Sequence, residues 1–286
     1  MTNNTRGTSV QLSDGDFNFI CEFVYQSTGI VLNENKREMV YRRLTRIVRD
    51  RKLNSFSDYC QLLRTQGDQE KDFFINAITT NLTSFFREKH HFDYLADEEL
   101  PKLMANKSVN ANGKKRLRIW SSASSTGEEP YSIAITVLET MRSVMSAWDV
   151  KILATDIDSN VLATGKAGVY EYRRIENIDE DLKPKYFQRG SGANQNNIRV
   201  NKELSDLITF KQLNLLHEWP MKGQFDVIFC RNVIIYFDKP TQQELFARYY
   251  DLLAPGGLLM LGHSENLGAY QQHFNNAGRT IFRKPL

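Results

Sequence analysis

The chain has 286 residues, of which 41% are hydrophobic and 25% charged, and its formal net charge is +3. These values are ordinary for a soluble globular protein of one large or two modest domains, and the charge alone does not indicate nucleic-acid binding. Three widely spaced cysteines form neither a disulfide framework nor a zinc motif, which favours a reducing compartment. Because the sequence has no apolar run of ~20 residues and no signal-peptide core, we expect a cytoplasmic protein without direct membrane insertion.

The N-terminal part of the chain shows helical patterns only. Residues 1–12 are polar and predict a disordered tail, and residues 13–80 predict a helical domain. Its first helix should begin near Ser13, where capping residues cluster, and end at Gly29. Three further helices are expected at 33–52, 55–66 and 68–80.

Residues 81–105 predict a connecting segment with a helix that ends near Met104, and residues 106–286 then alternate between strand and helix patterns. This alternation predicts an α/β domain whose mostly parallel sheet is covered on both faces. Between about 170 and 206 the alternation breaks, and a glycine-containing turn predicts a small inserted antiparallel β subdomain. We expect strands at Leu117–Ala123, Val150–Ile157, Leu207–Leu213, Phe225–Cys230 and Leu258–Gly262, and helices at Pro130–Val144 and Thr241–Leu253.

The turn after the first expected strand carries acids where a nucleotide-binding fold usually carries glycines. It holds Gly127, Glu128 and Glu129 and lacks the G-x-G-x-x-G pattern. A pyrophosphate there would be repelled, because two like charges 4 Å apart cost about 1–4 kcal/mol at effective dielectric constants of 80 to 20. The next strand ends at Asp156, where an acid commonly binds ribose hydroxyls. S-adenosylmethionine, a cationic nucleoside, fits this charge; alternatively, the two glutamates only favour a helix N-terminus.

The sequence contains five long motifs in order: "NLTSFFRE", "WSSASSTGEEPYSIA", "ATDID", "FCRNVIIYFD" and "LGHSEN". In this order and spacing, they resemble the CheR family of chemotaxis receptor methyltransferases over nearly the whole chain. The resemblance implies an all-helical N-terminal domain followed by a Rossmann-like, class I S-adenosylmethionine-dependent methyltransferase domain with an inserted β subdomain. It also implies methylation of glutamates on chemoreceptors for sensory adaptation, with glutamate methyl esters and S-adenosylhomocysteine as products.

The same resemblance implies the site residues. Glu129 is expected to meet the ammonium group of the cofactor, Asp156 the ribose, and Asn214 with Leu215 the adenine. The full set expected to bind the cofactor is Asn81, Thr83, Arg87, Glu129, Asp156, Asn214, Leu215, Arg231 and Asn232.

Arg87 and Tyr236 are the candidate catalytic residues, Arg87 because its cation could also orient an acidic substrate and Tyr236 because the resemblance places it near the reacting centre. Plainer interpretations remain open: a surface ion pair for Arg87, helix capping for Asn81 and Thr83, and a core aromatic for Tyr236.

Methyl transfer to a carboxylate needs neither a general base nor a metal. A glutamate with a pKa of about 4.3 is already ionised at neutral pH, and alignment of the reactants can supply roughly 7–11 kcal/mol. The five histidines show no ligand spacing, so no metal is expected. The "GHSEN" segment at 262–266 resembles a hydrolase nucleophile elbow but lacks its final glycine, and we interpret it as a structural loop at the edge of the site.

Two features suggest how a receptor is recognised. Arg42, Arg46 and Arg49 fall within about 60° of one another on the second helix, which is usually a solvated face. Here we hypothesise that the stripe docks the helical cytoplasmic region of chemoreceptors and brings the enzyme to membrane receptor arrays. Gly190 and Gly192 resemble the loop of family members that bind a receptor's C-terminal peptide by adding a strand, although a tight hairpin would use the glycines equally.

Two rival functions remain on sequence grounds. An S-adenosylmethionine-dependent RNA methyltransferase would use the basic helix on phosphates, but no "N/D-P-P-Y"-type motif lies near the strand at 225–230, and we expect no nucleic-acid partner. A non-catalytic, nucleoside-sensing receptor scaffold is the second rival. Intact Arg87, Glu129, Asp156 and Tyr236 favour the enzyme.

Overall fold

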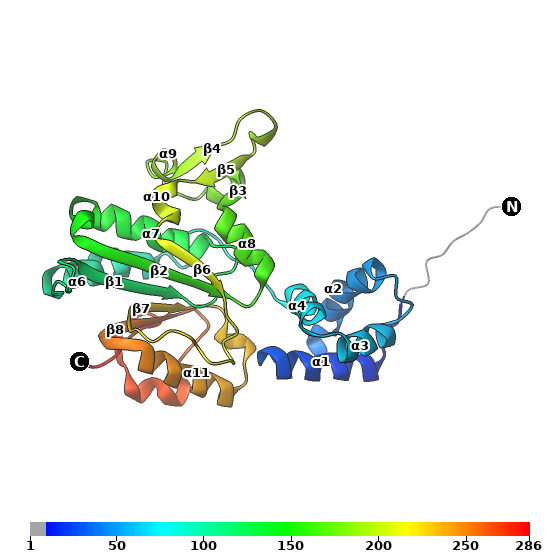
Figure 1. The fold of residues 1–286 in the computed structure, drawn as a ribbon. Helices are drawn as coiled ribbons and strands as arrows, with labels where there is room; N and C mark the ends of the chain where they lie inside the picture. The colour runs from blue at the N-terminus through cyan, green and yellow to red at the C-terminus, as the bar shows by residue number, and fades with distance from the viewer. Residues whose placement is uncertain (1–9) are drawn as a thin grey trace. The chain divides into compact units, whose positions relative to one another are not determined.

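The computed structural model describes residues 10–286, apart from the side chains of residues 68 and 69, and most of the expected tail therefore lies outside the described residues (Figure 1). The chain divides into two compact units, with the boundary between Thr80 and Asn81. No helix within residues 10–286 combines the length and apolar content needed to cross a membrane.

The first unit is helical. Two of its helices start at serine caps: the Ser13 hydroxyl accepts a hydrogen bond from the Asp16 amide at 3.1 Å, and the Ser55 hydroxyl accepts one from the Asp58 amide at 3.0 Å. The expected helix at 33–52 begins as a short 3₁₀ turn, and its α-helical part starts at Arg37. The helices are α1 (Asp14–Thr28), α2 (Arg37–Asp50), α3 (Phe56–Thr65) and α4 (Asp68–Ile78).

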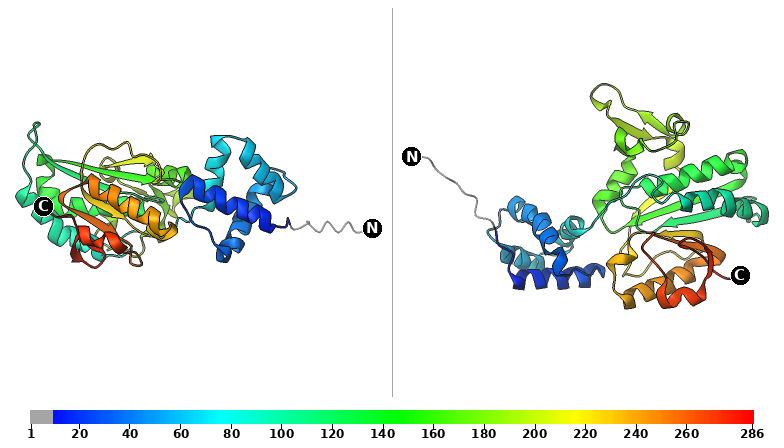
Figure 2. Two further views of the ribbon diagram at one scale, coloured as in Figure 1. Left: turned by 90° about the horizontal axis from the view of Figure 1, so that it is seen from below. Right: turned by 180° about the vertical axis from the view of Figure 1, so that it is seen from behind.

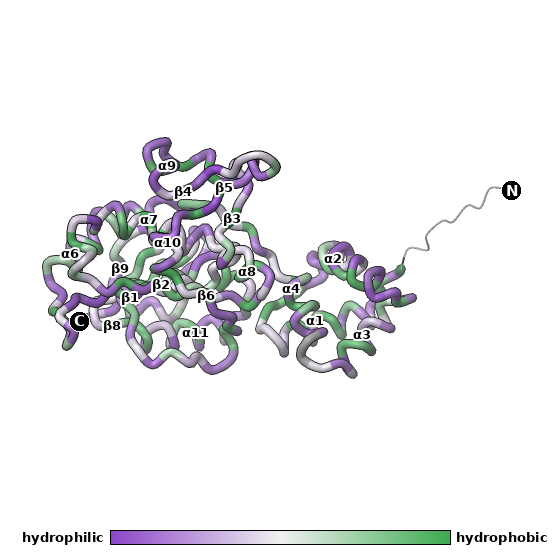
Figure 3. The backbone as a smooth tube through the Cα atoms, turned by 45° about the horizontal axis from the view of Figure 1, so that its top comes forward, coloured by the Kyte–Doolittle hydropathy of each residue, from purple (hydrophilic) through white to green (hydrophobic). Residues whose placement is uncertain are grey.

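Helix α2 is strongly amphipathic, and hydrophilic and hydrophobic residues alternate along it in Figure 3. Val40 and Leu44 are fully buried in the core of the unit. The side chains of Arg42 and Arg46 are 72% and 87% exposed and make only loose contacts of 3.6 Å with acids of the same helix. Arg49 is also exposed. The three arginines therefore form a solvent-facing basic stripe.

The second unit is built on a seven-stranded sheet with strand order β6-β2-β1-β7-β8-β10-β9. The first five strands in this order are parallel, and β10 and β9 are antiparallel. The strands are β1 (Lys115–Ser121), β2 (Trp148–Asp156), β6 (Ile208–Gln212), β7 (Phe225–Cys230), β8 (Leu253–Leu261), β9 (Asn275–Gly278) and β10 (Ile281–Arg283).

Helices cover both faces of this sheet: Figures 1 and 2 show α7 on one side and α11 on the other. The strand order reverses between β1 and β7, so this is the switch point of a doubly wound sheet, where such folds bind ligands. The helix expected before β1 is interrupted by a π-helical turn at Leu95–Glu99. The helices are α5 (His90–Tyr94), α6 (Leu100–Asn106), α7 (Glu128–Met141), α8 (Ser159–Ala167) and α11 (Lys239–Leu252).

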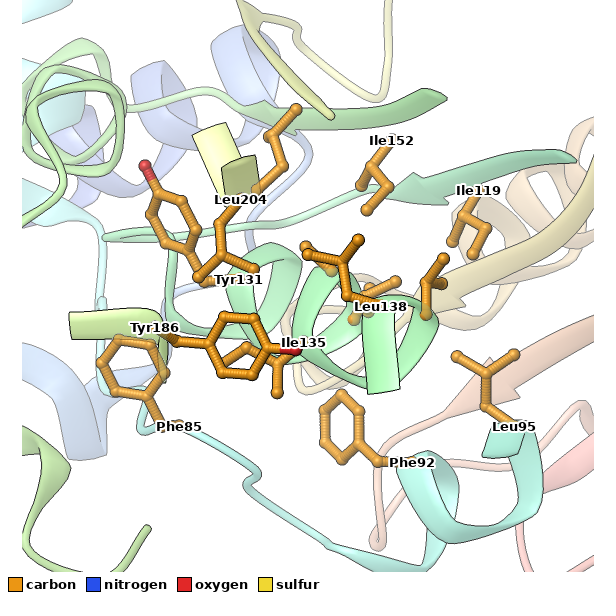
Figure 4. Close-up of a cluster of buried hydrophobic side chains, with 14 of the residues drawn as sticks. Phe85, Phe92, Leu95, Ile119, Tyr131, Ile135, Leu138, Ile152, Tyr186 and Leu204 are labelled. Carbon is orange, nitrogen blue, oxygen red and sulfur yellow. The ribbon is translucent and has the colours of Figure 1, made fainter. Parts of the chain in front are cut away.

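Because helix α7 is buried on nearly all sides, apolar residues occur on all of its faces. Figure 4 shows Ile119 and Ile152 of the sheet on one side of α7, and Phe92 and Leu95 of the preceding helices on the other. These side chains belong to one large hydrophobic cluster. Packing on two sides fixes the first turn of α7, which carries Glu128 and Glu129, against the end of β1.

The end of the chain differs from the sequence prediction. The Pro-Gly-Gly segment after α11 lies inside β8, so this strand begins before the expected Leu258, and its pairing with β7 shifts between Phe225 and Val227. An irregularity of this kind accommodates extra residues in one of two paired strands without ending that strand. Strands β9 and β10 were not predicted, because both are short and β9 begins with two asparagines.

The inserted β subdomain is a three-stranded antiparallel sheet with strand order β3-β5-β4. It is joined to α7 by side-chain contacts. The Tyr186 hydroxyl donates a hydrogen bond to Glu139 at 2.5 Å, and Arg174 forms an ion pair with Glu128. The subdomain contains β3 (Val169–Glu171), α9 (Lys183–Tyr186), β4 (Phe187–Arg189), β5 (Asn197–Val200) and α10 (Lys202–Ser205).

The pair between Glu128 and Arg174 accounts for one of the two acids in the first turn. The Glu128 side chain is fully buried, and its second oxygen accepts a hydrogen bond from the Thr126 hydroxyl at 2.5 Å. Arg174 comes from the 3₁₀ turn at Tyr172–Ile175 and keeps about a third of its side chain exposed. Glu128 therefore links the turn to the subdomain, whereas Glu129 faces other partners.

Replacing Arg174 by alanine should destabilise the second unit by about 1–3 kcal/mol, because Glu128 would remain buried without its cation. Urea unfolding followed by tryptophan fluorescence measures this unit alone, since all three tryptophans (Trp120, Trp148 and Trp219) lie in it. The matched control is Arg173→Ala, whose side chain is 73% exposed and should change stability by less than about 0.5 kcal/mol. Equal effects of the two substitutions would contradict this account.

Candidate functional site

The candidate site lies at the carboxyl ends of β1, β2 and β7. Ser121 pairs in register with Ala154 of β2 and with Phe229 of β7, so the loops that follow these three strands begin at the same level of the sheet. Most of the residues that the sequence predicts to bind a cofactor lie on these loops or on the segment 81–88. The side chains that these loops bring together determine the chemistry of the site.

A buried ion pair joins the first and third loops. One carboxylate oxygen of Glu129 accepts a hydrogen bond from the Ser121 hydroxyl at 2.7 Å, and the other accepts one from Nη1 of Arg231 at 2.8 Å. The exposed fractions of the two side chains are 11% and 1%. Burial raises the pKa of Glu129, and the neighbouring Arg231 and Ser121 oppose that rise.

Glu88 is a second carboxylate partner of Arg231, and sequence reasoning missed it. Its Oε2 lies 3.3 Å from Nη2 of Arg231 and accepts a hydrogen bond from the His263 amide at 3.0 Å, and its Oε1 accepts one from the Asn232 side chain at 3.2 Å. Burial acts to raise the pKa of Glu88, but Arg231 and these hydrogen bonds lower it overall. Its position as the last residue of "NLTSFFRE" was the available signal.

Asp156 ends β2 and is held by backbone amides. It accepts hydrogen bonds from the amides of Ser125 at 2.8 Å and Asp158 at 3.0 Å, and burial raises its pKa to about 6. Asp158 instead caps α8 through the amides of Asn160 and Val161, and its other oxygen accepts a hydrogen bond from Asn81 at 2.7 Å. Asp156 is therefore the acid at this strand end that is not used as a helix cap.

The segment 81–88 lies against the first loop. The Asn81 carbonyl accepts a hydrogen bond from the Ser125 hydroxyl at 3.0 Å, and Thr83 is half-buried. Nη1 of Arg87 donates to the Leu82 carbonyl at 2.8 Å. Within the described part of the chain, no carboxylate lies in ion-pair range of the Arg87 guanidinium, so this arginine is not the surface ion pair that the sequence left open.

Asn214 and Leu215 follow β6, next to the end of β2, where the Leu213 amide donates to the Asp156 carbonyl at 2.9 Å. The Leu215 carbonyl accepts hydrogen bonds from Nη1 of Arg248 at 2.7 Å and from the Trp219 indole at 3.1 Å. The Arg248 guanidinium stacks 4.0 Å from the centre of a Trp219 ring. Helix α11 thus holds this loop through Arg248, a residue that sequence reasoning missed because its partners are backbone carbonyls.

Asn232 and Tyr236 lie on the turn after β7. Asn232 has a positive φ of 57°, and its backbone amide donates to the Glu265 carboxylate at 2.8 Å. Tyr236 ends the short 3₁₀ helix that starts at Ile234, and it is only half-buried. It is therefore not a fully buried core aromatic, which was the plainer interpretation of its sequence position.

Unusual backbone conformations gather at this site. Among residues 10–286, six non-glycine residues have positive φ, and four of them (Phe86, Glu88, Ser125 and Asn232) lie on the loops described above. Such conformations persist only where the surroundings hold them, and they cluster at functional sites. At Gly127, with φ 98°, a Cβ would lie 2.8 Å from Cα of Gly165, so the first loop requires glycine there.

The site fits S-adenosylmethionine better than a phosphate ligand. Its first loop presents the Glu129 carboxylate, which suits an ammonium group and repels phosphate. Two buried polar atoms in it, the Ser124 hydroxyl and Nε of Arg231, lack hydrogen-bond partners in the part of the chain that the structure describes, and could bind a ligand. Across residues 10–286, no three His, Cys, Asp or Glu side chains are grouped to hold a metal ion.

The predicted docking residues lie elsewhere. Arg42, Arg46 and Arg49 belong to the first unit. Gly190 and Gly192 lie on the hairpin between β4 and β5, where a Cβ on Gly190 would lie 2.2 Å from the Asn194 carbonyl oxygen and Gly192 has φ 57°. The hairpin itself therefore needs both glycines, whether or not a peptide binds there.

Comparison with known proteins identifies the family. The model of the "CheR methyltransferase, SAM binding domain" matches residues 81–283, and that of the "CheR methyltransferase, all-alpha domain" matches residues 15–79. A chemotaxis protein methyltransferase of Escherichia coli (strain K12) is 44% identical over 95% of this chain and 91% of its own length. Chemotaxis protein methyltransferase 2 of Pseudomonas aeruginosa is 46% identical over 93% of this chain and 92% of its own length. The chain therefore belongs to the CheR family of S-adenosylmethionine-dependent chemotaxis methyltransferases.

Proposed function

We propose that the protein methylates glutamate side chains of chemoreceptors and releases glutamate methyl esters and S-adenosylhomocysteine. The observation that supports an acidic substrate is Arg87, whose guanidinium lies on a cofactor-site segment without a carboxylate partner among the described residues. A substrate carboxylate is the natural partner of such a group. The family membership supplies the methyl-transfer chemistry and the chemotactic setting.

The cofactor residues have separate roles in this proposal. Glu129 accepts hydrogen bonds from the ammonium group, and Asp156 accepts them from the ribose hydroxyls. Asn214 and Leu215 border the adenine. The remaining contacts, mainly to the methionine part, come from Asn81, Thr83, Arg87, Arg231 and Asn232. When bound, S-adenosylmethionine supplies a methyl group activated by its positively charged sulfur.

The residues of this chain need only hold and orient the substrate. A glutamate carboxylate is ionised at neutral pH and already carries the electron pair that forms the new bond, so no side chain has to remove a proton. Arg87 and Tyr236 orient that carboxylate towards the methyl carbon. The rate then depends on alignment, for which a misplacement of about 1 Å can cost a factor of roughly 100.

The proposal predicts base-labile methyl groups on receptors. Incubation of the protein with radiolabelled S-adenosylmethionine and receptor-bearing membranes should release labelled methanol on treatment with base, because esters hydrolyse whereas N-methyl groups do not. Receptors with glutamine at the methylated positions are the matched control and should give no label. Label on added RNA, or binding of S-adenosylhomocysteine without any transfer, would instead support one of the two rival functions.

The affinity for S-adenosylhomocysteine should fall as the pH is lowered through about 6. Burial raises the pKa of Asp156 to about 6, and only the ionised carboxylate can accept hydrogen bonds from both ribose hydroxyls. Between pH 7 and pH 5, calorimetry should therefore show about a tenfold loss of affinity.

In Asp156→Asn, a variant of the same shape without the titrating group, this pH dependence should be flatter. A residual slope is expected from Glu129, whose pKa is also raised by burial. An unchanged slope in the variant would show that Asp156 does not contact the ribose.

For receptor recognition, we propose that the basic stripe on α2 docks the glutamate-rich helical region of chemoreceptors in the cytoplasm, which would recruit the enzyme to receptor arrays. The three arginines are exposed and only loosely paired within their own helix, so their charge is available to a partner. Complementary charge mainly accelerates association and is weakened by salt.

Replacing Arg42, Arg46 and Arg49 by alanine should raise KM for receptor while leaving the Kd for S-adenosylhomocysteine unchanged, because these residues lie outside the cofactor site. We expect roughly a tenfold loss of kcat/KM at low ionic strength and a smaller loss at high salt. The triple lysine variant keeps the charge and should retain most of the activity. Equal turnover by the alanine variant and the wild type at physiological salt would exclude the stripe as a docking surface.

The β subdomain offers a second place for receptor contact. A groove of about 650 Å³ runs beside the edge strand β4 and is lined in part by Phe187, Gln188 and Arg189. An exposed edge strand can accept an additional strand from a peptide. We propose that a receptor's C-terminal peptide binds along β4, with Gly190 and Gly192 permitting its close approach.

A further inference from the structure

The carboxylate of Glu265, in the segment interpreted from sequence as a structural loop, binds an unusual number of backbone amides. The residue is 5% exposed and follows β8. No lysine or arginine forms an ion pair with it in the part of the chain that the structure describes. Instead, it accepts hydrogen bonds from the amides of Gly262 at 2.6 Å, Asn232, Val233 and Ile234 at 2.8 Å each, and Ile235 at 3.4 Å.

Four of these five amides are consecutive and belong to the turn that leads to Tyr236. Asn232 has left-handed backbone geometry, and consecutive amides in such a turn converge on one point and form an anion-binding nest. Without the carboxylate, these amides, of which that of Ile234 belongs to a buried residue, would lose their shared partner, which is costly. The conformation of the turn at 232–235 therefore depends on Glu265.

The packing of the two loops is close enough to require glycine at position 262. A Cβ there would lie 2.6 Å from the Asn232 side-chain nitrogen and 2.7 Å from Oε2 of Glu265. The end of β8 and the turn after β7 are thus fitted together around this carboxylate. Arg231, by contrast, is fixed by Glu129 and Glu88, so Glu265 acts on the turn that follows Arg231.

We propose that Glu265 is a positioning residue for methyl transfer: its carboxylate holds the turn at 232–235 and thereby places Tyr236 at the reacting centre. The inference rests on the proposed role of Tyr236. The proposal assigns the "GHSEN" segment a role in positioning Tyr236 as well as in connecting the strand to the rest of the chain. It also predicts that loss of this carboxylate impairs turnover more than cofactor binding, because Glu265 bonds only Asn232 among the proposed cofactor residues and does not contact Glu129 or Asp156.

The first test is hydrogen–deuterium exchange on the ligand-free protein, which needs no substrate. In Glu265→Gln the side chain keeps its shape but turns an NH₂ group towards amide donors, so the amides of 232–235 should exchange at least about tenfold faster. The Ser125 amide, which Asp156 holds, should be unaffected. Unchanged exchange at 232–235 would overturn the proposal.

The second test separates turnover from cofactor affinity. Glu265→Gln should lower kcat about 10- to 100-fold, while the Kd for S-adenosylhomocysteine stays within about threefold. A parallel loss of affinity and kcat would overturn the proposal, since Glu265 would then support the cofactor site as a whole. The wild-type protein reports separately on the proposed function: an absence of base-labile methyl groups on receptors would refute that function, and the exchange experiment would still decide the role of Glu265.

The matched control is Glu99→Gln. Glu99 is also a buried carboxylate of this unit, with 1% of its side chain exposed and an ion pair to Arg283 at 2.7 Å. Arg283 pairs with Leu258 within β8, before the loop that carries Glu265. This variant should lose stability but keep its kcat and its exchange at 232–235, and a kcat loss equal to that of Glu265→Gln would overturn the proposal. If Glu265→Gln does not fold, Glu265→Asp, which withdraws the carboxylate by one methylene, should show a smaller change in the same two assays.

Discussion

The arrangement of the site depends on one buried cation between two carboxylates. Arg231 contacts Glu129 from α7 and Glu88 from the segment before α5, and so connects three parts of the chain that are far apart in sequence. Removing one partner of such a buried group is costly, because the remaining charges lose compensation in a medium of low dielectric constant. The three charges leave a net negative charge of one. Attraction for a cationic ligand is thus a consequence of the network itself, and a phosphate would meet repulsion at the same place.

Around this network, backbone conformations that are unfavourable in isolation are stabilised by side chains from other loops. The positive φ of Ser125 is accompanied by a hydrogen bond from its amide to Asp156, and that of Asn232 by a hydrogen bond to Glu265. In both cases a buried carboxylate accepts backbone amides that have no partner in the sheet. The loops therefore reach their shape through pairwise contacts between them, which gives a rigid site without long regular elements.

These contacts also explain what the sequence could and could not predict. The alternation of strand and helix patterns predicted the parallel sheet, and it also predicted the position of Asp156 at the end of a strand. Glu88, Arg174 and Glu265 act through partners that lie 144, 46 and 33 residues away in the chain, so the sequence around each residue does not reveal its partner. Glu128 and Glu129 are adjacent and chemically alike, yet one pairs with the β subdomain and the other with Arg231. Only the fold separates their roles. The two antiparallel strands at the end of the chain have only four and three residues, which is too short for a periodic pattern to identify them.

The proposed reaction places opposite electrostatic demands on one edge of the sheet. A net negative pocket suits the cationic cofactor but repels a glutamate carboxylate, whose approach would cost on the order of 1 kcal/mol per unpaired charge even at solvent-like screening.

The chain has two means of offsetting this repulsion. Arg87, without a carboxylate partner among the described residues, supplies positive charge on a segment of the site itself, and the positive charge of the bound cofactor neutralises the excess from Glu129 and Glu88. In the first unit, the arginines of α2 concentrate positive charge on a solvent-facing helix where a large acidic partner can be held. In the proposed reaction, buried charge within the site would select the cofactor, whereas the exposed arginines of α2 would attract the receptor.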